Sequence, residues 1–146
     1  MERWLIQLIT ATMGAFIFSL IFNVRGKAVI YTTLGGFLAW GCYLIFKLLG
    51  LTPPMGYLLV SIIITIYAEI SARIHRSPAT VFLVSAIIPL VPGSRLYATM
   101  VFAVHQDWQG FMDKGIETLL LAVAIAAGII VVSTVMHAIY AAKGRN

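Results

Sequence analysis

The stretch that decides the fold is residues 77–100, which read SPATVFLVSAIIPLVPGSRLYATM. It is apolar and long enough to cross a bilayer, yet Pro89, Pro92 and Gly93 interrupt it near the middle. A proline removes a backbone donor and clashes with the preceding helical turn. In hydrocarbon, the carbonyl groups that this frees need protein or water as partners. The stretch therefore predicts a helix broken at membrane depth, an arrangement found at transporter sites.

The whole chain has the composition of an integral membrane protein. Of its 146 residues, 61% are hydrophobic and only 10% are charged, whereas about a quarter of the residues in a soluble domain are charged. A chain of this length has room for one membrane domain, residues 1–146, with about four to six spans. The net charge of +5 comes from basic residues in short gaps between apolar segments. This is the pattern of topology signals, and it argues against nucleic-acid binding.

Five apolar segments follow one another along the chain. They cover residues 4–22, 28–49, 55–72, 79–104 and 116–140. The first is longer than the apolar region of a usual signal peptide, so we expect it to be retained as a span. We therefore predict an all-α integral membrane protein of about five transmembrane helices, with the fourth helix broken between Pro89 and Gly93.

The positions of the basic residues predict the orientation, because cytoplasmic loops are enriched in Lys and Arg. If the broken segment crosses fully, one side of the membrane collects Arg25, Lys27, Arg73, Arg76, Lys143 and Arg145. The other side keeps Arg3, Lys47 and Lys114, together with several acidic residues. We expect an outside N-terminus and a cytoplasmic C-terminus. A re-entrant fourth segment would instead place the C-terminus outside.

The residues around the break are candidates for a substrate site. We expect residues 89–94 to form a non-helical turn that lines a polar cavity, with Arg95 at its edge. Arg95 has two explanations: a cavity-facing cation that attracts a carboxylate, or a cation that reaches lipid headgroups near an interface. The hydroxyls of Ser85 and Thr99 can bond freed carbonyls or a polar substrate. The predicted substrate-binding residues are Pro89, Pro92, Gly93, Ser94, Arg95 and Tyr97.

Two acidic residues lie within or beside predicted spans. Glu69 is the candidate for proton coupling, because a buried carboxyl group can take up a proton. The alternative is an ordinary helix-surface pair with Arg73, which follows four residues later. Glu117 opens the last segment, where the helix dipole favours an acid.

Signals for metal or enzyme chemistry are absent from the sequence. Cys42 is the only cysteine, and neither His105 nor His137 has a partner at metal-ligand spacing. Residues 92–96, PGSRL, are not a nucleophile elbow. We predict no metal, no cofactor and no enzymatic activity.

Small residues recur at helix-packing spacing. They form the sets Ala11, Ala15 and Ser19; Gly35 and Ala39; Ala122 and Ala126; and Ala124 and Gly128. Such faces let helices approach closely. They fit packing within this chain or docking onto a second membrane protein, and they leave a homo-oligomer open.

Three stretches resemble the threonine/serine exporter family. They are AEISAR at 68–73, SPATVF at 77–82 and IPLVPGS at 88–94. The similarity is to the C-terminal, five-span half of these exporters, which many bacteria encode as a separate small subunit. It is tight over about residues 68–97, while length and span count fit over nearly the whole chain. One departure is Arg95, where we expect a small residue, often glycine.

The resemblance implies a transporter subunit in the bacterial inner membrane. It would export small polar metabolites, threonine and serine first, driven by the proton gradient. Its larger partner would carry the other half of the exporter and a soluble N-terminal region. Some two-component members are associated with dicarboxylate (succinate) export, which Arg95 would suit. A hypothesis from another class is a structural subunit that only stabilises its partner.

Overall fold

The structure is a computed structural model that describes residues 2–143. Its elements are α1 (Glu2–Ile21), α2 (Ala28–Leu48), α3 (Pro53–His75), α4 (Ala79–Ile87), the 3-10 turn η1 (Ile88–Leu90), α5 (Gly93–Val104) and α6 (Trp108–Lys143). Four helices, α1, α2, α3 and α6, are long and apolar enough to cross a membrane. The α4–η1 segment and α5 together form a fifth such unit, bent by 54°. The prediction of an all-α membrane protein with about five helices, one of them broken, is confirmed.

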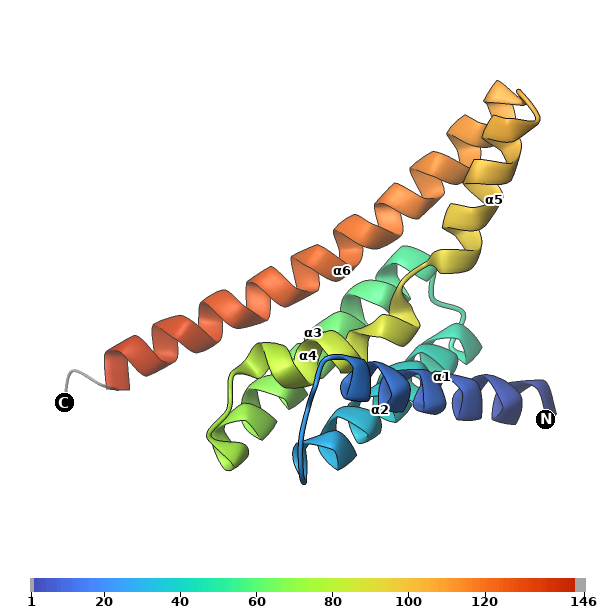
Figure 1. The fold of residues 1–146 in the computed structure, drawn as a ribbon. Helices are drawn as coiled ribbons and strands as arrows, with labels where there is room; N and C mark the ends of the chain where they lie inside the picture. The colour runs from blue at the N-terminus through green and yellow to red at the C-terminus, as the bar shows by residue number, and fades with distance from the viewer. Residues whose placement is uncertain (1, 144–146) are drawn as a thin grey trace.

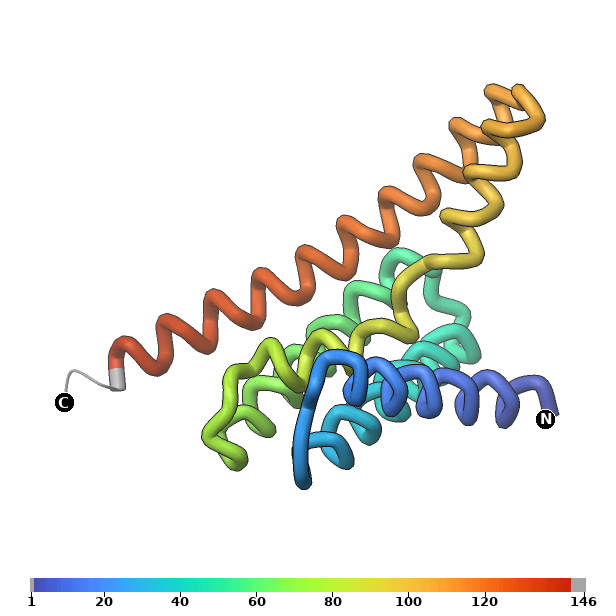
Figure 2. Tube along the Cα trace, viewed as in Figure 1, coloured from blue at the N-terminus to red at the C-terminus, as the bar shows by residue number. Residues whose placement is uncertain are grey.

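The helices form a bundle with a projecting hairpin. Helices α1 to α4 pack together, and α6 runs diagonally across α3 (Figure 1). Helix α5 packs against the first part of α6, and these two helices stand away from α1 and α2 (Figure 2). We call this pair the α5–α6 hairpin. The break between η1 and α5 is the point at which the chain leaves the bundle.

The ends of the helices lie on two sides of the molecule. The α1–α2 turn, the α3–α4 turn and the far end of α6 lie toward the left in Figure 1. The start of α1, the α2–α3 turn and the α5–α6 turn lie toward the right. This arrangement agrees with a fourth segment that crosses the domain. The side that faces the cytoplasm stays a prediction, and Arg145, one of its basic residues, lies outside the described residues.

Several helix ends follow from local chemistry. Pro53 and Pro54 occupy the first positions of α3, where a missing N–H has no cost and the fixed φ suits a helix. Helix α6 begins at Trp108, eight residues before the expected span, because Asp107 caps it. The Asp107 Oδ1 accepts a hydrogen bond of 3.0 Å from the Gly110 N–H, as an N-cap residue does. The polar residues 108–114 are therefore helical, and only 105–107 form the turn.

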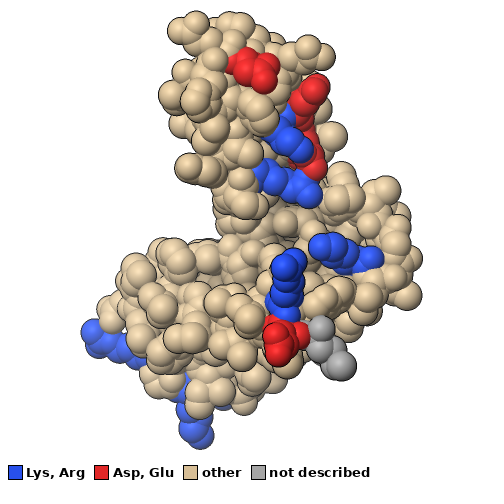
Figure 3. Space-filling model, turned by 90° about the vertical axis from the view of Figure 1, so that its right-hand side faces the viewer, with Lys and Arg blue, Asp and Glu red and all other residues tan. Residues whose placement is uncertain are grey.

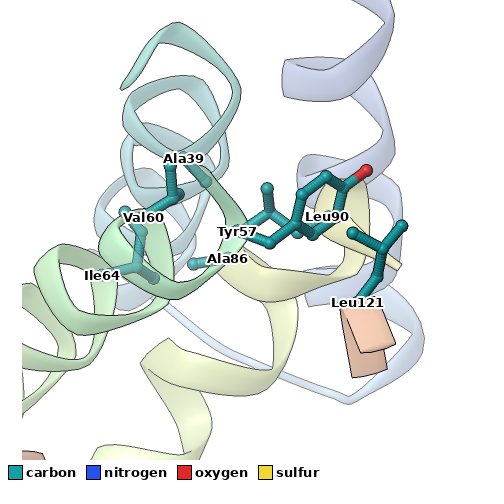
Figure 4. Packing of buried hydrophobic residues seen from close by; sticks show 7 residues of the cluster. All are labelled: Ala39, Tyr57, Val60, Ile64, Ala86, Leu90 and Leu121. Carbon is teal, nitrogen blue, oxygen red and sulfur yellow. The ribbon is translucent and has the colours of Figure 1, made fainter. Parts of the chain in front are cut away.

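A buried apolar cluster holds the break in place. Its members are Ala39, Tyr57, Val60, Ile64, Ala86, Leu90 and Leu121, which come from α2, α3, α4, η1 and α6 (Figure 4). Leu90, two residues before Pro92, is fully buried in this cluster. Because the cluster joins four helices at Leu90, the direction of the chain at the break is fixed by packing.

Small residues provide the close helix contacts inside the chain. A Cβ atom added at Gly35 would lie 2.7 Å from the Ala86 Cβ, which joins α2 to α4. One added at Gly36 would overlap Ala15 of α1, and one at Gly128 would overlap Ser61 of α3. These contacts favour packing within the chain for the faces that carry Ala15, Gly35 and Gly128. Ala122 and Ala126 are exposed instead.

Candidate functional site

The break is narrower than the sequence predicts. Pro89 lies inside the 3-10 turn η1, and Gly93 and Ser94 already belong to α5, so only Val91 and Pro92 lie outside a helix. The expectation of a non-helical turn over residues 89–94 is therefore wrong at its ends. The reason is that a proline can precede a helix without disturbing it, because the first N–H groups are unpaired in any case. The Pro92 carbonyl accepts the N–H groups of Arg95 and Leu96 at 3.1 and 3.0 Å.

Arg95 lies in the first turn of α5 and forms an ion pair with Glu117 of α6. Lys114 Nζ is 3.1 Å from the other oxygen of Glu117. Nearby, Thr99 Oγ1 donates to the Arg95 carbonyl at 2.9 Å and lies 3.5 Å from the Thr118 hydroxyl. We call these residues the hairpin polar cluster. Within this cluster Glu117 neutralises the charge of Arg95, so a carboxylate of the cargo would have to compete with Glu117 for the guanidinium.

Sequence reasoning missed this partner. Glu117 was explained by the helix dipole, and it stands 22 residues after Arg95 along the chain. No local periodicity links the two residues. Only the antiparallel α5–α6 hairpin brings them together. Figure 3 shows acidic and basic atoms side by side on the upper lobe.

The predicted substrate residues have different surroundings within residues 2–143. Pro89 lines a hollow of about 260 Å³ with Trp40 and three residues of α1. Gly93, Ser94 and Tyr97 are exposed, and Tyr97 has 72% of its surface accessible. Pro92 is half-buried. In a lone chain these positions form an open surface at the bend, and their substrate role stays a prediction.

A hydroxyl group lies unpaired one turn before the break. Ser85 is fully buried in α4, and its Oγ has no hydrogen-bond partner within residues 2–143. Thr99, on the other side of the break, instead bonds the backbone of its own helix. Of the two hydroxyls predicted to bond freed carbonyls, Thr99 bonds a backbone carbonyl and Ser85 bonds none within residues 2–143.

A second candidate site lies at the opposite end of α3 from its prolines. A cavity of about 660 Å³ opens between α3, the α3–α4 turn, the start of α4 and the far part of α6. Its charged or titratable lining residues are Glu69, Arg73, Arg76 and His137. Its volume falls within the range of about 300–1,000 Å³ that is usual for small-molecule sites. We call it the α3–α4–α6 cavity.

Glu69 and Arg73 are bonded to each other on the wall of this cavity. Arg73 Nη2 donates to Glu69 Oε2 at 3.0 Å, and the Glu69 side chain is only 14% exposed. The Arg73 guanidinium also lies 3.6 Å from the centre of the Tyr140 ring, a favourable cation–π distance. The ion pair expected between Glu69 and Arg73 is present. The ion pair does not test the proton-coupling role of Glu69. Because Glu69 also lines the cavity, that role stays a prediction.

Metal chemistry finds no support in the described part of the chain. Among residues 2–143, no group of three or more His, Cys, Asp or Glu side chains lies close enough to hold a metal ion. The features that a polar solute could use are the ion pairs, the hydroxyl groups and the backbone at the bend.

A bundle of long apolar helices with one bent segment defines a multi-pass membrane protein. The family model described as "Threonine/Serine exporter, ThrE" matches residues 7–135 of this chain. The chain therefore belongs to the threonine/serine exporter family, a family of membrane transporters. No solved structure shows a significant match to it.

Proposed function

We propose that this chain is one subunit of an exporter that moves small polar metabolites, threonine and serine first, out of a bacterial cell. The family match over residues 7–135 carries this proposal, since it includes the whole broken segment. The bend at Val91–Pro92 supports it, because an interrupted helix offers backbone groups that a polar solute can bond. The proton gradient would drive export, with Glu69 as the carboxyl group that takes up and releases the proton.

We further propose that the exporter includes a larger membrane partner with a soluble N-terminal region. Within residues 2–143, helix α5 has substantial contacts with α6 alone, and its apolar residues Leu96, Met100 and Val104 are 54%, 61% and 79% exposed. They recur every fourth position and therefore share one face of the helix. A partner helix on this face would enclose the exposed positions Gly93, Ser94 and Tyr97 and turn the open bend into a lined passage.

Dicarboxylate export is the second candidate. The observation that favours it is the excess of guanidinium groups over carboxylates along the α3–α4–α6 cavity, where Arg73 and Arg76 face a single acid, Glu69. This lining carries one net positive charge, so it attracts a doubly negative cargo more strongly than a zwitterion, which has no net charge.

The experiment is metabolite efflux from cells that lack this chain, its partner, or both. Cells are loaded with labelled threonine, serine or succinate, and release is followed over time. We expect each single deletion to abolish export of the same compound as the double deletion does. Export by cells that keep only the partner would show that the partner transports without this chain, and it would contradict the proposal.

A further inference from the structure

We propose that the α3–α4–α6 cavity is a binding site for the carboxylate group of a small solute, with the Arg76 guanidinium as its main partner. This inference rests on the proposed function and adds to it a site away from the broken helix. The features that carry it are the cavity itself and the Glu69–Arg73 ion pair, which leaves Arg76 as the available cation of the lining.

The charges of the cavity lining leave one cation available. Arg73 is held by the Glu69 carboxylate and by the Tyr140 ring. Arg76 lines the same cavity, and within residues 2–143 it has no carboxylate within ion-pairing distance. The guanidinium fork matches a carboxylate through two parallel hydrogen bonds. A carboxylate is therefore the group that this cavity is equipped to bind.

The backbone at Arg76 fixes where its side chain leaves the chain. Helix α3 ends there in the left-handed conformation, with φ 50° and ψ 43°. Glycine is the usual residue at such a helix end, because a side chain is disfavoured in this region. The chain instead places a long cationic side chain at this point, at the rim of the cavity. Asn23 and Gln106 have the same left-handed conformation, so the conformation places the Arg76 side chain but does not by itself indicate a ligand.

The other polar residues of the cavity lining suit a small polar solute. Ser133 and His137 line the cavity from α6, and Thr80 lines it from the first turn of α4. These groups can donate or accept hydrogen bonds to the remaining polar groups of the solute. The site lies near the α3–α4 turn, at the end of the domain that the basic residues assign to the cytoplasm, where a solute bound for export would enter.

The test is equilibrium binding to the full chain in nanodiscs of phosphatidylcholine, with labelled succinate and labelled threonine as probes. The key variant is Arg76→Gly, which removes the guanidinium and relieves the left-handed strain, so the fold is retained. Gln106→Gly is the matched control, because Gln106 has φ 57° in the α5–α6 turn and does not line the cavity.

We expect Arg76→Gly to weaken binding of at least one probe roughly tenfold or more, the effect of losing a charged hydrogen bond. Arg76→Lys should recover part of it, Gln106→Gly should change nothing, and the amide of threonine should not compete. Equal binding by wild type and Arg76→Gly, or equal loss in both glycine variants, would overturn the site. If phosphatidylglycerol carried over from the cell membrane stays bound at Arg76 and neither probe binds, the residue belongs to a lipid headgroup site, which would overturn the proposal too.

The binding and efflux experiments fail independently. Binding that depends on Arg76 in a chain whose deletion leaves efflux unchanged would keep this site and remove the exporter proposal. Efflux that depends on the chain, with probe binding that ignores Arg76, would keep the exporter and remove this site.

Discussion

At the scale of single residues, Arg95 shows how a charge is accommodated beside a break in a membrane helix. Placing an arginine at the centre of a span costs about 2.5–3.5 kcal/mol on insertion scales. Glu117 lowers this cost by forming an ion pair with Arg95 across the hairpin. Arg95 is therefore not an unpaired cation. A carboxylate of the cargo could bind it only by competing with Glu117.

The first prediction concerns this pair. Arg95→Glu should lower the thermal stability of the detergent-solubilised chain, because it places two acids side by side. The charge-exchanged double variant Arg95→Glu/Glu117→Arg should recover most of the loss. Since both side chains are partly exposed, at 27% and 36%, we expect a coupling free energy of about 0.5–1 kcal/mol from the double-mutant cycle. Additive effects of the two substitutions would mean that the pair contributes nothing.

Ion pairs were predictable from the sequence where the two residues lie close together along the chain. The Glu69–Arg73 pair follows from a spacing of four residues on a helix, and it is present. The Arg95–Glu117 pair could not be foreseen, because it depends on the angle at which α5 leaves the break. For the same reason the sequence offered Arg76 only as a topology signal, although it lines a cavity built from three helices.

At the scale of helices, the contact between α3 and α6 depends on one glycine. A Cβ atom at Gly128 would meet Ser61 Oγ and would lie 2.9 Å from the Leu58 carbonyl oxygen. Backbone atoms cannot move aside as a flexible side chain can. The second prediction is that Gly128→Ala lowers the free energy of unfolding by about 1–3 kcal/mol, as overpacking does.

Gly14→Ala is the control for this substitution. Gly14 lies within α1, and a Cβ atom there would meet nothing within 4 Å. Its replacement should leave stability unchanged or raise it by up to about 1 kcal/mol, since alanine favours the helix. Denaturant unfolding in one detergent compares the two variants. Equal stability of Gly128→Ala and wild type would show that α6 does not pack on α3 as described.

Helices were predictable from the sequence where apolar segments end at strong signals. The start of α2 and the turn before α3 follow from the gap at 23–27 and from Pro53–Pro54. The start of α6 was not predictable from composition, because residues 108–114 are polar. Asp107 nevertheless caps a helix there, so α6 begins before its apolar segment does. The width of the break was overestimated because Pro92 begins a helix as readily as it ends one.

At the scale of the whole molecule, the orientation in the membrane can be tested directly. The third prediction is that cysteines placed singly at Arg25 and Arg145, in a Cys42→Ala background, react with an impermeant maleimide only after the cells are permeabilised. A cysteine at Asp107 should react in intact cells, because the α5–α6 turn lies on the other side of the domain from the α1–α2 turn. Labelling of position 145 in intact cells would invert the last span.

The central claim is that the broken fourth segment takes part in export, and efflux from variants at the bend tests it most directly. A Cβ atom at Gly93 would meet nothing within 4 Å and Gly93 is exposed, so the first atom of the Gly93→Leu side chain has open space. Pro92→Ala likewise removes the restriction at the bend without adding bulk. Gly14→Leu, at an equally open position in α1, is the matched control.

The measurement is efflux of labelled threonine, serine and succinate from cells that contain the partner and equal amounts of each variant in the membrane. The account predicts that Gly93→Leu and Pro92→Ala lose most of the efflux, while Gly14→Leu keeps the wild-type rate. Wild-type efflux from both bend variants would contradict it, and would show that the break only shapes a supporting subunit.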